Sequence, residues 1–243
     1  MKKEITSFDF EPGRILAKKY RVVSRLGGGW EGEVYKLLEL ETNIERAGKF
    51  FFPHRNTGNR ALRFYAKILH RLRHCEMLIH YNTQETITFR GRQISFLVSE
   101  YVEGILLSDF LSKRRGKKLH RFEALHLLHA LAKGLECVHN RKEYHGDLHP
   151  YNIIVTGYGL EFKLKLIDMF HWQAATAENI RGDIYDLIRI FYDSLGGAKT
   201  YSKHPKEIKQ IICGLKKTLI RKKYKSARQL RAYLENMWLD SLL

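Results

Sequence analysis

A carboxylate and an amide near the middle of the chain have the types and spacing to do chemistry together. The run His145-Gly146-Asp147-Leu148-His149-Pro150-Tyr151-Asn152 places Asp147 five residues before Asn152. A carboxylate can accept the proton of a hydroxyl group. Asp168 follows a hydrophobic stretch sixteen residues after Asn152. Oxygen atoms from Asn152 and Asp168 are ligands that Mg²⁺ prefers, with phosphate oxygens completing its shell.

A glycine-rich run earlier in the chain could bind phosphates. Leu26-Gly27-Gly28-Gly29-Trp30-Glu31-Gly32-Glu33-Val34 contains G-x-G-x-x-G-x-V. Glycines there let the backbone approach a phosphate that side chains would keep away. The pattern also occurs in dinucleotide folds, but predicted strands on both sides favour a hairpin that covers phosphates. A plain hairpin turn is the alternative.

Lys49 follows Val34 by fifteen residues, in Ala47-Gly48-Lys49 on a predicted strand. A lysine that faces into a sheet needs an anion, and phosphate oxygens would serve. The alternative is a lysine that extends from an exposed edge into water. Of the two histidines beside Asp147, His145 is interpreted as a structural support. His149 could contact substrate or cap the turn.

The elements that must position these residues change in character along the chain. Strands and one helix are predicted for the first hundred residues, at 20–26, 33–40, 46–52, 61–72 (the helix, by its apolar periodicity), 86–89 and 94–101. Helices then dominate, at 122–139, 183–195, 205–220 and 226–237, with one hairpin at 152–167. A β-rich front and an α-rich back predict an α+β fold of two lobes with a hinge near 100–104.

The order and spacing of these motifs resemble the protein-kinase-like superfamily over nearly the whole chain. The resemblance implies one bilobal domain over 1–243, with a β-rich N-lobe (1–100), a hinge (101–104) and a reduced α-helical C-lobe (105–243). It implies ATP as cofactor with Mg²⁺. It assigns nucleotide binding to Leu26, Gly27, Gly29, Gly32, Val34, Ala47, Lys49, Glu100 and Val102, the last two through backbone groups that hold the adenine.

The resemblance also implies the catalytic roles. Lys49, Asp147 and Asn152 would be catalytic, with Asp147 orienting the acceptor hydroxyl. Asn152 and Asp168 would bind the metal. His145 and Asp183 would support the catalytic loop.

The helix after the third predicted strand lacks the glutamate that the family pairs with its lysine. The aligned position is Tyr65, and no acid occurs between Glu45 and Glu76. Lys49 must therefore meet the phosphates without a partner, or borrow Glu31, Glu33 or a distant acid.

The segment after the metal motif also departs from the family. The motif is Asp168-Met169-Phe170, and only fourteen residues separate Asp168 from Asp183, with no Ala-Pro-Glu. Gly146 replaces the arginine that would bind a phosphorylated activation loop. A second arginine of the family pattern, which would pair with the missing glutamate of Ala-Pro-Glu, is absent at 224–227. The run His-Gly-Asp-Leu-His-Pro is similar to that of aminoglycoside and choline phosphotransferases. Constitutive or partner-controlled activity is therefore expected, with Thr176 playing no regulatory part.

The composition suggests partners and a setting. The net charge is +17, concentrated in the basic stretches 55–74, 113–121 and 199–231. Such charge attracts acidic proteins, nucleic acid or anionic membrane, although a solvated surface is the simpler interpretation. No apolar run could span a bilayer, and the N-terminus lacks the apolar stretch of a signal peptide. Three widely spaced cysteines favour a cytoplasmic setting without disulfides.

These features predict an ATP- and Mg-dependent phosphotransferase. An atypical Ser/Thr protein kinase with a truncated activation segment, acting on a protein acceptor, fits best. The alternatives are a nucleotide-binding pseudokinase or scaffold, and a kinase for small-molecule hydroxyls.

Overall fold

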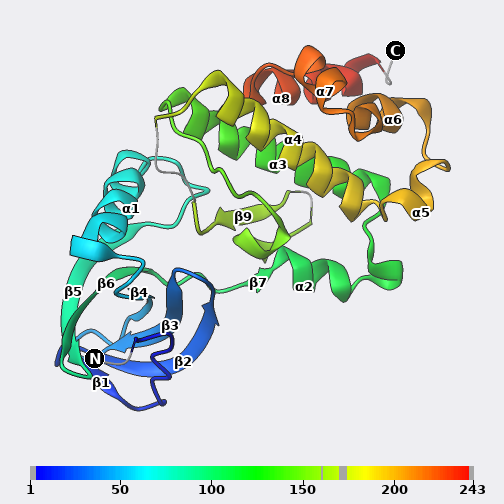
Figure 1. Cartoon of the computed structure of the whole chain (residues 1–243). Helices are drawn as coiled ribbons and strands as arrows, with labels where there is room; N and C mark the ends of the chain where they lie inside the picture. The colour runs from blue at the N-terminus through cyan, green and yellow to red at the C-terminus, as the bar shows by residue number, and fades with distance from the viewer. Residues whose placement is uncertain (1–3, 160, 170–173, 241–243) are drawn as a thin grey trace. The chain divides into compact units, whose positions relative to one another are not determined.

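A six-stranded antiparallel sheet carries the first part of the chain (Figure 1), in the order β1-β2-β3-β4-β6-β5. The computed structural model describes residues 4–159, 161–169 and 174–240. The strands are β1 (Ile15–Leu16), β2 (Tyr20–Gly28), β3 (Gly32–Glu39), β4 (Glu45–Phe51), β5 (Tyr81–Phe89) and β6 (Arg92–Glu100). With helix α1 (Arg60–Arg71) and the 3-10 turn Thr57–Asn59, they form one of two units, Met1–Arg73 with Ile79–Val102.

One face of this sheet packs into an aromatic core. Alternating strand residues such as Tyr35, Phe50 and Phe96 are fully buried there. Three residues that precede the first predicted strand join the same core, namely Ile5, Phe8 and Phe10. The rings of Phe8 and Phe10 lie 5.8 and 5.0 Å from that of Phe50. The segment before β1 is therefore part of the folded unit.

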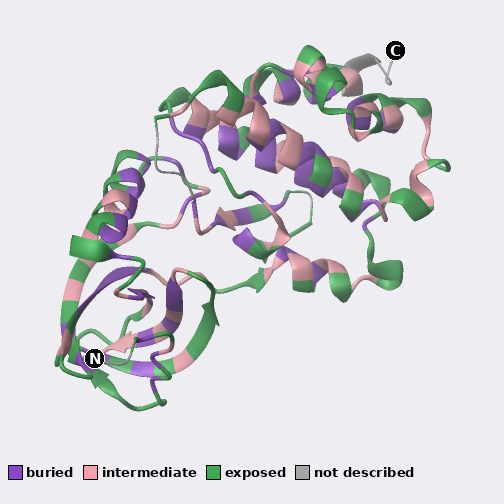
Figure 2. Ribbon diagram, in the orientation of Figure 1, coloured by how far each residue is buried: buried purple, intermediate pink, exposed green. Residues whose placement is uncertain are grey.

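Helix α1 covers the opposite face of the sheet. Its buried residues are Ala61, Leu62, Tyr65, Ile68 and Leu69, and part of this face packs with Phe51 and Leu97 of the sheet. Figure 2 shows buried residues along one side of α1 only. The apolar face predicted from the helical periodicity is confirmed.

The second unit, His74–Leu78 with Glu103–Leu243, is mainly helical. Its described residues form a small antiparallel sheet of β7 (Ile105–Leu106), β8 (Ile153–Gly157) and β9 (Lys163–Leu166). They also form the helices α2 (Leu107–Ser112), α3 (Arg121–Asn140), α4 (Ala177–Ser194), α5 (Ala198–Tyr201), α6 (Lys206–Ile212), α7 (Lys217–Lys223) and α8 (Ala227–Asp240). The 3-10 turns are Arg115–Lys117, Pro150–Asn152 and Cys213–Leu215. Helix α3 packs against α4 and α8 (Figure 1). Among the described residues, no helix could cross a bilayer.

Two helix predictions need correction. The predicted helix 205–220 is two helices, α6 and α7, because Cys213 and Gly214 have left-handed backbone (φ 53° and 60°). Helix α4 begins six residues earlier than Asp183 because Thr176 caps it. The Thr176 hydroxyl accepts the Asn179 backbone N–H at 3.2 Å, which satisfies a donor in the first turn.

The prediction of no disulfide is wrong. Cys75 and Cys137 form a bridge between residues 62 positions apart, and Cys213 is free. The bridge ties the segment His74–Leu78 to helix α3, whereas the chain on either side of this segment belongs to the first unit. Backbone contacts anchor the same segment, since the N–H of Leu166 donates to the carbonyl of Met77 at 2.6 Å.

Candidate active site

Asn152 holds the loop that carries Asp147. It ends the short 3-10 turn before β8, and its side chain is buried. The amide nitrogen donates to the backbone carbonyl of Asp147 at 2.8 Å and to its carboxylate at 3.3 Å. The same nitrogen lies 3.2 Å from Nε2 of His149. The amide oxygen is therefore turned away from these contacts and can serve as a ligand, while the Asp147 side chain is half exposed, at 51%.

His145 supports the loop that carries Asp147 through two hydrogen bonds of its ring. Its side chain is fully buried, and Nδ1 accepts the backbone N–H of Asp147 at 3.3 Å. The other ring nitrogen, Nε2, lies 3.0 Å from the carbonyl of Ile167, so it carries the hydrogen and donates. Burial lowers the pKa of His145, which favours this neutral form. The ring thus joins the Asp147 loop to the strand end that precedes Asp168.

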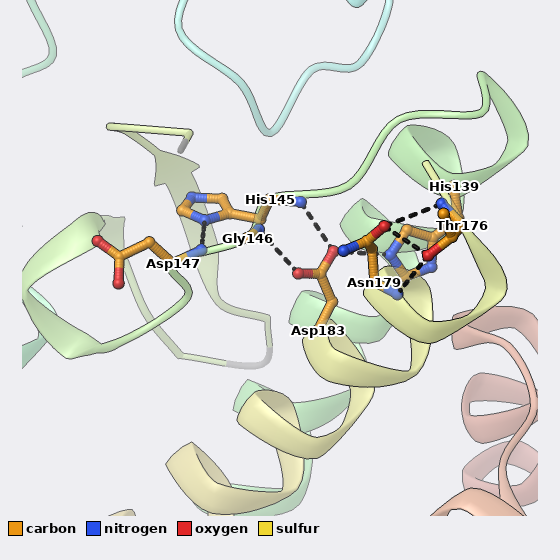
Figure 3. A network of polar contacts seen from close by, with 7 residues as sticks. All are labelled: His139, His145, Gly146, Asp147, Thr176, Asn179 and Asp183. Atoms are coloured by element: carbon orange, nitrogen blue, oxygen red, sulfur yellow. Dashed lines mark hydrogen bonds and ion pairs between the residues drawn. The ribbon is translucent and has the colours of Figure 1, made fainter. Parts of the chain in front are cut away.

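Asp183 of helix α4 fixes the same loop by its backbone. Figure 3 shows its carboxylate facing the backbone of His145 and Gly146, whose N–H groups donate to it at 2.8 and 2.9 Å. Nε2 of His139, from the end of α3, lies 2.9 Å away. Gly146 has φ +80°, a conformation that glycine adopts at little cost. Nothing in the sequence had singled out His139, whose helix shows only an ordinary apolar stripe.

Asp168 follows β9 by two residues, on a segment that is hydrogen-bonded to Asn152. The N–H of Ile167 donates to the backbone carbonyl of Asn152 at 3.0 Å, which places the two predicted metal ligands on adjoining segments. Asp168 itself has left-handed backbone, with φ 54°. Among the described residues, no group of three or more His, Cys, Asp or Glu could hold a metal ion. Phe170 of the metal motif lies outside the described residues.

The first unit gathers the predicted phosphate-binding residues on one sheet face. Val34 pairs with Lys49 across β3 and β4, and Ala47 pairs with Lys36 two residues away, so Val34, Ala47 and Lys49 point the same way. At Gly32 a Cβ atom would lie 1.9 Å from the carbonyl oxygen of Phe50, so only glycine fits. The N–H of Gly29 donates to the carbonyl of Gly32 at 2.9 Å and closes the turn. Leu26, Gly27 and Gly29 are exposed on this hairpin.

Lys49 meets a carboxylate of the glycine loop and an aromatic ring of α1. Its ammonium lies 3.3 Å from Oε2 of Glu31. It also lies 4.6 Å from the ring centre of Tyr65, the residue at the position of the family's helix glutamate. Of the alternatives raised by the sequence, the structure therefore shows the pair with Glu31. Glu33 points into the core instead.

The two residues predicted to hold the adenine are at the end of β6. Glu100 is the last residue of the strand, and its N–H donates to the carbonyl of His80 at 3.0 Å. Val102 lies two residues further, outside the strand and half-buried. Ser99, one residue earlier, pairs with Ala47 and so shares its face of the sheet.

The stretch 224–227 lacks the arginine of the family pattern, as its sequence shows. Three residues before this stretch, Arg221 of α7 forms an ion pair with Glu178 in the first turn of α4. The side chains of Arg221 and Glu178 are 36% and 61% exposed, so water screens the pair and it contributes at most about 1 kcal/mol to stability.

Comparison with known proteins agrees with this arrangement. A family model described as "Protein kinase domain" matches residues 20–186. The serine/threonine-protein kinase PrkC of Bacillus subtilis (strain 168) is 25% identical over 210 residues, 76% of this chain and 31% of that protein. The probable serine/threonine-protein kinase CPE1738 of Clostridium perfringens (strain 13 / Type A) is 28% identical over 148 residues, 61% of this chain and 21% of that protein. The chain thus spans about a third or less of these relatives.

The fold is that of a solved kinase domain. The crystal structure of the Mycobacterium tuberculosis PknI kinase domain superposes with a TM-score of 0.67, covering 93% of this chain and 99% of that one at 21% identity. This likeness confirms the predicted α+β fold with a β-rich front and a helical back. Because the family model covers well over half of the sequence, the chain belongs to the protein kinase domain family.

Proposed function

We propose that the chain is an ATP- and Mg-dependent kinase that transfers the γ-phosphoryl group to a Ser or Thr hydroxyl of a protein. The observation that carries this proposal is the loop held by Asp183, in which Asp147 is half exposed beside the buried Asn152. A loop fixed in this way can orient a hydroxyl, and kinases depend mainly on such positioning. The two relatives named above are described as serine/threonine kinases, which supports a protein acceptor.

The proposal gives each residue one role. Asp147 would accept the proton of the acceptor hydroxyl. Lys49 would bind phosphate oxygens under the glycine hairpin, which supplies Leu26, Gly27, Gly29, Gly32 and Val34. Backbone groups of Glu100 and Val102 would hold the adenine beside Ala47. The chain would act as a single kinase domain over 1–243.

The residues present fit magnesium. Asn152 offers an amide oxygen and Asp168 a carboxylate, and Mg²⁺ commonly takes only one or two protein ligands together with substrate phosphates. The ion would neutralise charge that develops on the transferred phosphoryl group. The lack of a larger acidic or histidine cluster among the described residues is compatible with this two-ligand arrangement.

A pseudokinase is the second candidate, and a specific observation favours it. Tyr65 takes the place of the helix glutamate that active relatives of this family pattern use. The intact set of Asp147, Asn152 and Asp168 supports activity instead. A kinase for small-molecule hydroxyls remains the other alternative, suggested by the sequence around Asp147.

Phosphate transfer separates these candidates. The purified protein is incubated with Mg²⁺ and γ-labelled ATP, with protein and small-molecule acceptors, beside Asp147→Asn. We expect wild type to label a protein and Asp147→Asn to lose the transfer. Both should keep a Mg-ATP-dependent rise in melting temperature, equivalent to about 2.7 kcal/mol at a hundred times the dissociation constant.

The other outcomes are equally clear. Nucleotide binding by wild type without transfer would establish the pseudokinase. A transfer to small molecules alone would establish the second enzyme class. Equal transfer by Asp147→Asn would refute the role of Asp147, and no melting shift with Mg-ATP would refute every nucleotide-binding proposal.

The basic stretches are proposed as docking sites for an acidic protein or nucleic acid. Lys222, Lys225 and Arg228 are exposed and suit a charge-reversal test, with loss of binding and a weaker salt dependence expected. Lys223 is a poor probe because its ammonium donates to the carbonyl of Gln210 at 2.9 Å and lies 4.0 Å from the Tyr233 ring centre. Unchanged binding by the triple variant would exclude this surface.

A cytoplasmic location is also part of the proposal, supported by the composition. The Cys75–Cys137 bridge points the other way, since disulfides are rare in the cytosol. Alkylation of thiols in intact cells, followed by peptide mass spectrometry, decides the matter. Full alkylation of Cys75 in the cytosolic fraction would place the protein there in reduced form.

A further inference from the structure

We propose that Glu31 is the positioning residue for Lys49, so that the glycine loop itself supplies the carboxylate that the family takes from its helix. The inference rests on the proposed phosphotransfer. It assigns Glu31 no contact with the reacting atoms, since it acts through Lys49.

The surroundings of the Lys49 ammonium support this role. Glu31 Oε2 lies 3.3 Å from Nζ, and the two side chains are only 18% and 14% exposed, so water screens the pair weakly. The ring centres of Tyr65 and Phe51 lie 4.6 and 5.5 Å from the ammonium. Rings attract a cation without fixing its direction as a carboxylate does. Among these three contacts, the carboxylate of Glu31 is therefore the one that can fix the direction of the ammonium.

The backbone holds Glu31 in place for this contact. Its carbonyl accepts the N–H of Phe52 at 2.9 Å, next to the pairing of Gly32 with Phe51. Lys49 lies in β4, two residues before Phe51. Glu31 thus immediately precedes β3 and is hydrogen-bonded to the residue that follows β4, so backbone hydrogen bonds set the spacing of the two segments that carry the ion pair.

This arrangement changes what controls the lysine. In the family pattern the lysine pairs with a glutamate of the helix, and the position of that helix controls whether the pair forms. Helix α1 has no acid to offer, because none occurs between Glu45 and Glu76. The position of Lys49 should instead follow the glycine loop, so that nucleotide binding and lysine placement are coupled within the adjoining strands β2, β3 and β4.

The alternative is that Glu31 obstructs the phosphates, since a carboxylate on the loop that covers them would repel them. These two roles of Glu31 predict opposite changes in the transfer rate of Glu31→Gln. If Glu31 obstructs, Glu31→Gln should bind Mg-ATP more tightly and transfer faster. If Glu31 positions Lys49, the same change should slow transfer.

The test compares Glu31→Gln, the double variant Glu31→Gln with Tyr65→Glu, and the control Glu41→Gln. Glu41 is exposed in the turn after β3 and gives the same change of charge. We expect Glu31→Gln to lower kcat by about tenfold or more, with a smaller change in the KM for ATP, because misplaced phosphates slow the chemical step. Tyr65→Glu should restore kcat to within about threefold of wild type. Glu41→Gln should match wild type.

A second measurement does not depend on activity. The rate at which an amine-reactive acylating reagent labels Lys49, followed by peptide mass spectrometry, should rise at least about threefold in Glu31→Gln and not in Glu41→Gln, since the carboxylate covers the ammonium. If wild type lacks transfer but this rise occurs, the proposed function fails while the pairing stands. Unchanged or faster transfer, or unchanged labelling of Lys49, in Glu31→Gln would overturn the inference.

Discussion

Removal of the Cys75–Cys137 bridge should destabilise the protein by a predictable amount. The bridged residues are 62 positions apart, and the entropy lost by the unfolded chain on closing such a loop corresponds to about 4 kcal/mol. For a domain of this length, 1 kcal/mol shifts the melting temperature by roughly 2–4 °C. Reduction should therefore lower the melting temperature by roughly 8–16 °C.

The native contacts of the bridged segment should survive the loss. The carbonyl of Met77 still accepts from Leu166 at 2.6 Å, and the ammonium of Lys165 donates to the carbonyl of Leu78 at 3.1 Å. Neither contact involves a sulfur atom. Phosphate transfer at 25 °C should consequently change little, even though the unfolding temperature falls.

Melting curves with and without reductant measure the effect. The double variant Cys75→Ala with Cys137→Ala should melt low in both conditions. Cys213→Ala is the matched control, because its thiol is free, and it should respond to reductant as wild type does. Thiol counting under denaturing conditions identifies the starting state. Equal melting of oxidised and reduced wild type, with one thiol counted before reduction, would refute the chain-entropy reasoning; three thiols would refute the bridge.

Three further outcomes follow from the second unit. Asp183→Ala should lower the free energy of unfolding in urea by about 3–6 kcal/mol, because two backbone N–H groups lose a charged acceptor, and should abolish transfer. Thr176→Ala should cost about 1 kcal/mol through the lost helix cap while leaving the transfer rate within about twofold. Burial, and then the charge of Asp183, raise the pKa of Asp186 from 3.8 to about 7. The folded chain therefore holds this proton more tightly than the unfolded chain, and its contribution to stability should decline from about pH 4 to 7. Asp186→Asn should remove this decline, measured as the urea midpoint at each pH. A variant with the same pH profile as wild type would contradict the assignment of the raised pKa to Asp186.

Local patterns in the sequence predicted helices and strands well where a residue's environment depends on its neighbours in the sequence. The buried face of α1 follows from a 3.6-residue periodicity that includes Leu62, Tyr65 and Leu69. The strands around the glycine loop follow from the turn between them. The break between α6 and α7 also had a local signal, because Cys213 is followed by Gly214, but the surrounding apolar periodicity concealed it.

The disulfide could not be predicted in this way. Its two cysteines lie in a loop and a helix, and their proximity depends on where the segment His74–Leu78 attaches. An odd count and wide spacing argued against any bridge. Both observations concern the sequence alone, whereas bridging requires only that two Cβ atoms meet in space.

The candidate site was predicted in its residue types but not in its contacts. Residue type and spacing singled out Asp147, Asn152 and Asp168, whose roles stay predictions. It could not show that His139 joins the group around Asp183, since the distance between them is set by the packing of α3 on α4. It also left open which acid would meet Lys49, because that choice depends on the backbone of the glycine loop.

Glu33 shows why a choice between two nearby acids needs the three-dimensional structure. The Glu33 residue is 2% exposed, and a buried charge is costly unless hydrogen bonds compensate it. The N–H of Phe8 and the hydroxyl of Tyr35 donate to one oxygen at 3.1 and 2.6 Å, and Arg25 pairs with the other at 3.0 Å. Burial raises the pKa of Tyr35 to about 12, so its hydroxyl remains a donor.

The donor from Phe8 belongs to a segment that precedes residue 20, where the family match begins. That segment therefore extends the aromatic core and also donates a hydrogen bond that offsets part of the free-energy cost of burying the Glu33 carboxylate. The two acids on either side of Gly32, Glu31 and Glu33, consequently bind different partners. Glu31 meets Lys49 on the α1 side of the sheet, while Glu33 binds the N-terminal segment on the core side. Glu33 pairs with Phe50 in β3, so it could face Lys49 only if the strand shifted by one residue, which would also turn Tyr35 out of the core.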